Sequence, residues 1–325
     1  MAITDSQAVK YGFLVMYAED MYNPDGPNKL APSLDDRIEK SGWTVCATLT
    51  AEDNFASLVA PPGGKSKISG ERVFFGFVAQ NKEDLDLYAV VIRGTAGAIE
   101  WIIDAQFAPI PHPKHPNARV EHGFWDIFDT MQLADLNGKT TNQRATEGVA
   151  DLVGQDGKVV VVGHSLGSSL ATYFVQELAE RIHERATACM FASPHTGNKA
   201  WVDLFDATVT DYRLFNYLLD IVTHVPAGFD YLPLRKATKI EPKDAQAGVT
   251  VELRCNHHVI CYCAMLDFNQ TQPASRDDRD KACAKCILGD KGTVPREAKL
   301  LAAAIKVVQS FGDKAVARMI SEFGG

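Results

Sequence analysis

KVVVVGHSLGSSLATYFVQELAE, residues 158 to 180, is the stretch of the chain that decides the fold. It opens with four consecutive valines, and an unbroken β-branched run of this kind is typical of a strand buried on both faces of a parallel sheet. After the pentapeptide Gly163 to Gly167, apolar side chains recur every four residues, which predicts one buried face of a helix. These side chains are Leu166, Leu170, Phe174, Leu178 and Ile182.

The pentapeptide Gly163-His164-Ser165-Leu166-Gly167 follows the pattern G-x-S-x-G. Between a strand and a helix, this pattern predicts the nucleophile elbow of an α/β-hydrolase, in which a strained turn exposes the serine hydroxyl at the carboxyl end of the sheet. The glycines allow close passage of strand and helix, and the helix N-terminus offers N–H groups to a developing oxyanion. Because the pattern is short, the alternative is a purely structural turn, but the flanking strand and helix favour the nucleophile.

Composition narrows the class of protein. The chain has 325 residues, of which 46% are apolar and 23% charged, as in ordinary globular proteins. A net charge of −8 and the lack of a basic tract argue against a nucleic-acid partner. No apolar run reaches the roughly 18 residues of a membrane span. The N-terminal 20 residues have no basic segment before their apolar part, so we expect no signal peptide and a cytoplasmic protein, with a secreted mature form as the alternative.

Strand and helix patterns alternate along the chain, which predicts an α/β fold: a mostly parallel central sheet with helices on both faces. With no clear linker or repeat, we expect one domain over residues 1–325. The predicted helices cover residues 6–22, 124–133 and 166–182, with two more from 293 and 313 onwards. The predicted strands cover residues 43–49, 72–79, 87–92, 158–162, 189–192, 213–217 and, as the last, Val249 to Leu253.

A serine nucleophile needs a base, and the base needs an acid that orients it. In this fold the order along the chain is serine, acid, histidine. Asp220 follows the predicted strand at residues 213–217 and is the candidate acid, ahead of Asp211 and Asp230. The candidate bases are His257 and His258, which come after the predicted last strand.

Seven motifs between Tyr88 and Tyr262 resemble those of the class 3 lipases, whose best-known members are fungal triacylglycerol lipases. The departures from the family pattern are Ser168 and Ala192, where the family usually has glycine, and a cysteine-rich tail. The motifs are Tyr88 to Thr95 ending in Arg-Gly-Thr, Trp101-Ile-Ile-Asp104, Val120-Glu-His-Gly-Phe124 as a likeness of H-x-G-F, Gly163 to Gly167, Phe191 to Pro194 with Gly197-Asn198, Asp220-Ile-Val with Val225-Pro226, and His257 to Tyr262.

The resemblance implies roles for individual residues. It supports Asp220 as the acid, and it favours His257 over the alternative base His258, because a tyrosine then stands five residues later. It implies that Thr95 contributes to the oxyanion hole, where the N–H of Leu166, the residue after the nucleophile, would be the second donor.

The segment from Ala98 to Phe107 is unusually apolar for a short helix. Glu100 and Asp104 form its polar strip, and prolines end the helical pattern after it. The resemblance implies a short helical lid, over about residues 96–115, that closes above the serine in water and opens at a lipid interface. The alternative is a plain core helix. The apolar lid residues are Ile99, Trp101, Ile102, Ile103 and Phe107.

The predicted function is carboxylic ester hydrolysis through an acyl-serine, by a triacylglycerol lipase that meets lipid or ester substrates at an oil–water or membrane interface. A soluble carboxylesterase or a phospholipase A1 with the same residues is the alternative, and a lipid-binding module with little turnover is a third. We expect no cofactor and no metal, and the oligomeric state stays open. For Cys255, Cys261, Cys263, Cys283 and Cys286, disulfides or buried thiols are favoured over zinc binding.

Overall fold

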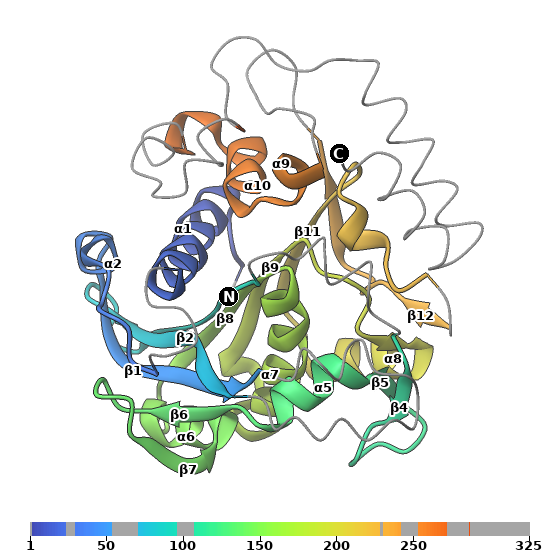
Figure 1. The fold of residues 1–325 in the computed structure, drawn as a ribbon, viewed down its shortest axis with the longest axis horizontal. Helices are drawn as coiled ribbons and strands as arrows, with labels where there is room; N and C mark the ends of the chain where they lie inside the picture. The colour runs from blue at the N-terminus through green and yellow to red at the C-terminus, as the bar shows by residue number, and fades with distance from the viewer. Residues whose placement is uncertain are drawn as a thin grey trace.

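The structure, a computed structural model, describes residues 2–23, 30–53, 71–95, 107–227, 230–241, 253–271 and residue 286. Helices and strands alternate along these residues (Figure 1), and a nine-stranded sheet lies at the centre in the order β13-β11-β9-β8-β3-β2-β1-β6-β7. Its strands are β1 (Trp43–Glu52), β2 (Arg72–Asn81), β3 (Leu87–Ile92), β6 (Gln132–Ala134), β7 (Thr140–Arg144), β8 (Lys158–His164), β9 (Ala186–Phe191), β11 (Tyr212–Tyr217) and β13 (Ala237–Ile240).

The sheet is parallel on the side that contains β8 and antiparallel on the other. From β13 to β3 the neighbouring strands run parallel, whereas β3, β2, β1, β6 and β7 pair antiparallel. Parallel neighbours need crossover connections, which here contain α7 (Leu166–Ile182) between β8 and β9, and α8 (Lys199–Thr208) between β9 and β11. The carboxyl ends of the parallel strands therefore share one edge, where a ligand site is expected.

The four valines of β8 show that both faces of the sheet are buried. Val159 and Val161 belong to the hydrophobic cluster that includes α7, while Val160 and Val162 belong to a second cluster on the opposite face. The side chains of all four are 0% exposed. The predicted buried parallel strand with helices on both sides is therefore confirmed.

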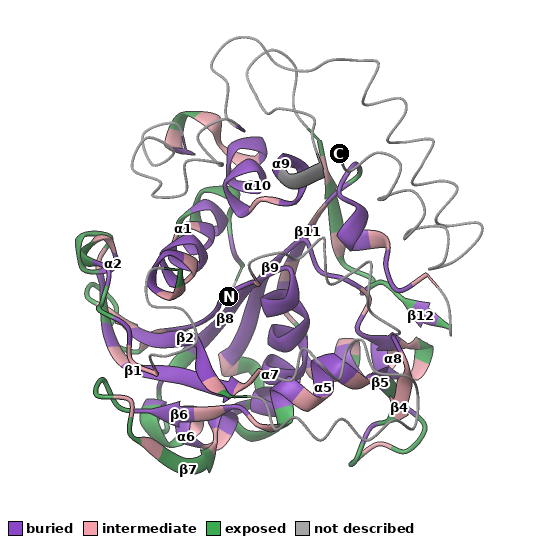
Figure 2. Cartoon of the chain, viewed as in Figure 1, coloured by how far each residue is buried: buried purple, intermediate pink, exposed green. Residues whose placement is uncertain are grey.

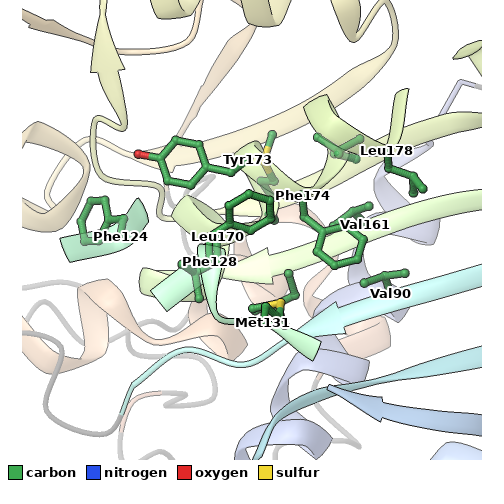
Figure 3. Close-up of a cluster of buried hydrophobic side chains, with 14 of the residues drawn as sticks. Val90, Phe124, Phe128, Met131, Val161, Leu170, Tyr173, Phe174 and Leu178 are labelled. Carbon is green, nitrogen blue, oxygen red and sulfur yellow. The ribbon is translucent and has the colours of Figure 1, made fainter. Parts of the chain in front are cut away.

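Helix α7 fills one of the two clusters with the side chains that recur every four residues. Figure 3 shows Leu170, Phe174 and Leu178 of this helix close to Val161 of β8 and Val90 of β3. Aromatic side chains from α5 (His122–Asp129) complete this layer, and the rings of Phe128 and Phe174 lie 6.4 Å apart between centroids. The sequence pattern therefore identified the packed face of the helix.

Helices α1 (Asp5–Tyr22) and α10 (Val259–Leu266) cover the opposite face and pack against one another (Figure 1). Helix α1 begins with a capping box, in which the hydroxyl of Thr4 accepts from the Gln7 N–H at 3.2 Å and the Gln7 side chain accepts from the Thr4 N–H at 2.9 Å. Its observed span agrees with the predicted helix at residues 6–22, although Thr4 is the residue that caps it.

A second, smaller sheet lies beside α5 and α8. Its four antiparallel strands follow the order β12-β10-β5-β4, with β4 at Pro109–Pro111, β5 at Arg119–Glu121, β10 at Gly197–Asn198 and β12 at Tyr231–Leu232. The sequence does not predict this sheet, because strands of two or three residues are too short to show a period of two. The remaining elements are α2 (Asp36–Lys40), α6 (Ala145–Val153), the 3-10 helices η2 (His183–Arg185) and η3 (Ile221–His224), and α9 (Leu253–His257).

Two predicted elements differ from the structure. The helix expected over residues 124–133 ends at Asp129, because Leu133 lies in β6 and pairs with Leu49 of β1. The last strand was placed at Val249 to Leu253, but Leu253 begins α9, and residues 249–252 lie outside the described residues. The predicted helices from 293 and 313 onwards also lie outside them, so the prediction of a single domain over residues 1–325 stays a prediction.

Burial follows the layers of the fold. Buried residues fill the central strands and the facing sides of the helices, and exposed ones gather at the edges and loops (Figure 2). In the part of the chain that the structure describes, no helix has both the length and the apolar character needed to cross a bilayer.

Candidate active site

Ser165 occupies the sharp turn between β8 and α7. Its backbone has φ 58° and ψ −127°, a strained conformation for a residue with a side chain. The Ser165 N–H donates to the Phe191 carbonyl at 3.1 Å, which ties the turn to the end of β9. A serine held in this way at the carboxyl end of a parallel strand has the geometry of a nucleophile elbow.

The two glycines of the pentapeptide make this turn possible. A Cβ atom on Gly163 would lie 2.3 Å from the Gly167 carbonyl oxygen, and a Cβ on Gly167 would lie 2.4 Å from the carbonyl oxygens of Ile92 and Arg93. Any side chain at either position would collide with backbone. The close approach also brings the end of β3 against the turn that holds Ser165.

A continuous chain of hydrogen bonds links Ser165, His257 and Asp220. The Nε2 atom of His257 lies 2.7 Å from Oγ of Ser165, and its Nδ1 lies 2.8 Å from Oδ2 of Asp220. All three side chains are buried, with exposed fractions of 0%, 5% and 0% for Ser165, His257 and Asp220. The structure thus brings together three residues that the sequence pattern selected from separate parts of the chain.

Asp220 is held from several sides at the start of η3. Its Oδ1 accepts from the Val222 N–H at 3.0 Å, and its Oδ2 accepts from the hydroxyl of Tyr262 at 2.6 Å. Burial, followed by the charge of Asp220, raises the pKa of Tyr262 well above its ordinary value, so the phenol keeps its proton and remains a donor. The sequence singles out Tyr262 only by its position five residues after His257, because the interval between two residues does not reveal what the hydroxyl contacts.

His257 is the last residue of α9. Its neighbour Asn256 binds the backbone just before the acid Asp220. The Asn256 side chain donates to the Leu219 carbonyl at 3.1 Å. His258, the alternative base, instead caps α10, where its Nδ1 accepts from the Ile260 N–H at 3.2 Å. Of the two adjacent histidines, His257 is the one whose ring faces Ser165.

Thr95 and Leu166 flank the serine from two elements. Thr95 is half-buried and follows β3 by three residues, while Leu166 is buried and opens α7, where the first backbone N–H groups have no partner within the helix. Gly94 lies against the elbow, since a Cβ on it would be 3.2 Å from the carbonyl oxygen of His164. Both candidate oxyanion residues are therefore attached to elements that meet at the turn.

Most of the predicted lid, residues 96–106 with Ile99, Trp101, Ile102 and Ile103, lies outside the described residues. Phe107 is described, and it is 1% exposed, packed edge-on against Phe124, with its carbonyl accepting from the hydroxyl of Tyr231 at 3.0 Å. Residues 109–111 form β4 rather than part of a helix. The described end of the predicted lid therefore begins with the buried Phe107, continues through β4 and ends in a turn at residues 112–115, where the His115 N–H donates to the His112 carbonyl.

The cysteines do not form a metal site among the described residues. Cys255 and Cys286 form a disulfide, and Cys261 and Cys263 are buried thiols on α10, whereas Cys283 lies outside the described residues. Throughout the described ranges, no group of three or more His, Cys, Asp or Glu side chains is arranged to hold a metal ion. Because Cys255 and Cys286 are disulfide-bonded, neither of them can serve as a zinc ligand.

Two positions refine the motif matches. A motif H-x-G-F that ends at Phe124 would begin at residue 121, where this chain has Glu121, so the match at Val120 to Phe124 lacks the first histidine of the motif. Glu121 is 1% exposed and caps α5 by accepting from the Phe124 N–H at 2.7 Å, whereas His122 pairs with Asp126 nearer the surface. Ala192, where the family usually has glycine, has φ 53°, a conformation that favours glycine.

A parallel sheet with a serine elbow, joined at its carboxyl edge to a histidine and an aspartate in that chain order, defines the α/β-hydrolase fold. A solved structure shares this fold. The Rhizomucor miehei lipase propeptide complex superimposes on this chain with a TM-score of 0.54 at 19% identity, covering 81% of this chain and 78% of that one. Residues 89–229 match the sequence model of the family described as Lipase (class 3), so this part of the chain is similar to the class 3 lipases.

Two curated relatives show which kinds of protein this chain is similar to. The lipase of Rhizomucor miehei is 27% identical over 206 residues, which cover 58% of this chain and 53% of the relative. Phospholipase A1-II 2 of Oryza sativa subsp. indica is 26% identical over 155 residues, covering 40% of this chain and 38% of the relative. The chain therefore spans about half, or less, of the length of the curated relatives it matches.

Proposed function

We propose that this protein is a serine ester hydrolase that acts on acylglycerol-type lipids, most simply as a triacylglycerol lipase. The observation that carries the proposal is the hydrogen-bonded chain from Asp220 through His257 to Ser165, with the serine in a strained elbow. Its class-level support is the match to the class 3 lipases.

In the first half-reaction, Oγ of Ser165 attacks the acyl carbonyl carbon while Nε2 of His257 takes the hydroxyl proton. Asp220 accepts a hydrogen bond from Nδ1–H of His257, which fixes the tautomer and stabilises the imidazolium. The backbone N–H groups of Leu166 and Thr95 donate to the oxyanion of the tetrahedral intermediate. Removal of one such donor typically costs about 3 kcal/mol of transition-state stabilisation.

The intermediate then collapses, and the alcohol leaves with the proton that His257 held. A water molecule attacks the acyl-serine as His257 takes one of its protons, and the second collapse returns that proton to Ser165 and releases the fatty acid. The cycle needs neither an oxidant nor a metal ion, because His257 passes the first proton to the alcohol and the second to Ser165, so protons balance in each half-reaction.

Support for a lipid substrate comes from the sequence of residues 98–107 and from the relatives. A short, apolar segment directly after Thr95 suits a lid that meets an apolar surface, and we propose that it uncovers Ser165 at a lipid interface. The buried nucleophile fits this proposal, since a hydroxyl with 0% exposure cannot meet a lipid without some opening. The relatives are named a lipase and a phospholipase A1, so the bond cleaved is a carboxylic ester in both.

One assay set tests the proposal: nitrophenyl esters with short and long acyl chains, emulsified triacylglycerol, and a phospholipid, each with wild type and Ser165→Ala. We expect hydrolysis that depends on Ser165 and rises when the substrate passes its solubility limit. A rate that saturates below that limit would favour the soluble carboxylesterase, and preference for the phospholipid would favour phospholipase A1. If no ester is hydrolysed, the remaining alternative is a lipid-binding module with little turnover.

A further inference from the structure

A partly buried carboxylate on α1, Glu19, whose side chain is 23% exposed, meets the active site from the face opposite α7. Its Oε1 lies 3.3 Å from Nδ1 of His164, the residue before the nucleophile, and accepts from the Gly94 N–H at 3.3 Å. The other ring nitrogen of His164, Nε2, donates to the backbone carbonyl of His257 at 2.5 Å. These contacts connect one carboxylate and one imidazole to four parts of the fold: α1, the end of β3, the elbow and α9.

The contacts of His164 give one ring nitrogen a defined role. A carbonyl only accepts, so Nε2 of His164 carries a proton. Nδ1 of His164 faces Oε1 of Glu19, the oxygen that also accepts from the Gly94 N–H. Burial by itself would raise the pKa of Glu19, but the hydrogen bond and charge of His164, together with the charge of His258, bring that pKa below its ordinary value.

Backbone and aromatic rings approach the pair closely. A Cβ on Gly94 would lie 2.9 Å from Oε1 of Glu19 and 3.2 Å from Nδ1 of His164, so glycine permits the contact. The rings of His164 and His257 lie 4.8 Å apart between centroids. One turn further along α1, Tyr22 lies under the buried guanidinium of Arg93, with 3.5 Å between the Arg93 Cζ and the ring centroid. Helix α1 therefore holds two successive residues at the end of β3.

We propose that Glu19 and His164 are positioning residues for ester hydrolysis: Glu19 ties the backbone before Thr95 to His164, and His164 fixes the backbone of the base His257. The inference rests on the proposed function, because it assigns the pair to the alignment of that reaction. Without the pair, the oxyanion donor and the base are free to shift independently. A misplacement of about 1 Å costs on the order of a hundredfold in rate.

The test compares Glu19→Gln, His164→Asn and the double variant, with Asp20→Asn as the matched control. Asp20 is the next residue of α1 and is more deeply buried than Glu19, but it pairs with Arg37, away from the active site. Active sites are counted by titration of Ser165 with a phosphonate, so that kcat refers only to folded enzyme. The substrate is a soluble nitrophenyl ester, and thermal unfolding is recorded for every variant.

We expect Glu19→Gln to lower kcat per active site about tenfold or more while KM is unchanged. The double variant should fall no further than His164→Asn alone, because the two residues act as one unit. Asp20→Asn should lose thermal stability and keep kcat within about twofold of wild type. A purely structural role of Glu19 would instead make it resemble this control.

Suppose that hydrolysis by the wild type depends on Ser165. An unchanged kcat in Glu19→Gln, or additive losses of kcat in the double variant, would then overturn this inference and leave the proposed function intact. A wild type that hydrolyses no ester would overturn the proposed function and this inference with it. The Ser165→Ala control separates these cases.

Discussion

The hydroxyl of Tyr262 donates to Oδ2 of Asp220, the same carboxylate oxygen that faces Nδ1 of His257. The same tyrosine oxygen accepts from the Tyr217 N–H at 3.1 Å, so it joins β11 to the acid. The carboxylate is therefore oriented by a donor that is covalently part of α10, and the orientation of His257 depends on it in turn.

Tyr262→Phe should lower kcat about tenfold, since it removes a hydrogen bond to a charged group that aligns the base. Tyr173→Phe is the matched control, because Tyr173 is an equally buried tyrosine whose hydroxyl donates to the Thr196 carbonyl at 2.7 Å, away from Asp220. Steady-state kinetics on a soluble ester measures both. Equal kcat values in the two variants would contradict a role for Tyr262 in holding the acid.

The two adjacent histidines should differ sharply in their effect on activity. His257→Gln removes the ring between Asp220 and Ser165 and should lower kcat by roughly ten-thousandfold. His258→Asn keeps a side chain that can cap α10, so it should leave kcat within about threefold of wild type and cost at most about 1 kcal/mol of stability. A collapse of activity in His258→Asn with a normal melting curve would refute the assignment.

Glu121 should make stability depend on pH in a direction opposite to that of most carboxylates. Burial raises its pKa to about 7 in the folded protein. Its stabilising contribution is therefore complete below the ordinary pKa of 4.5 and is lost as the pH rises through about 7. In the Glu121→Gln variant this loss, on the order of 3 kcal/mol, should disappear.

Urea unfolding at several pH values from about 4.5 to about 8 measures the effect as the difference between wild type and Glu121→Gln. The exposed Glu184→Gln is the control, whose difference from wild type should stay flat over this range. A flat difference for Glu121→Gln as well would mean that the buried carboxyl titrates at its ordinary pKa.

The disulfide between Cys255 and Cys286 should stabilise the folded protein by about 3 kcal/mol, because it closes a loop across a sequence separation of 31 residues. Cys255→Ser should lower the free energy of unfolding by that amount, and addition of a reductant should do the same to wild type. Cys46→Ser, which changes a half-buried free thiol, should have little effect. No response to either treatment would show that the crosslink is absent in solution.

Local sequence patterns were enough to predict the strand and the helix on either side of Ser165. The valines of β8 predict the strand and the four-residue spacing in α7 predicts the helix, and the turn lies between them. Each pattern is local, because it reflects which faces of that one element are buried. The chain order of serine, acid and histidine then selected Asp220 and His257, the two residues that the structure brings to Ser165. A resemblance in spacing, rather than any physical signal, separated His257 from His258.

Long-range contacts were beyond the reach of the sequence. Glu19 reads as one more polar residue on an apolar helix, and its contact with His164 spans 145 residues. Tyr262 reads as a spacing marker, although its hydroxyl reaches Asp220 across 42 residues. Val249 to Leu253 has the composition of a strand, yet Leu253 begins α9, where the contact between Asn256 and Leu219 fixes the chain beside the acid.

The packing of α1 against α10 has a consequence for biosynthesis. Residues 5–22 leave the ribosome before residues 259–266, which emerge some 240 residues later by the numbering of the chain. The strands β2, β3 and β8 that α1 also contacts, and the ring of His164 that Glu19 contacts, emerge in between. The reaction centre is therefore complete only once α9 and α10 have been synthesised, and until then the side of α1 that faces α10 stays uncovered.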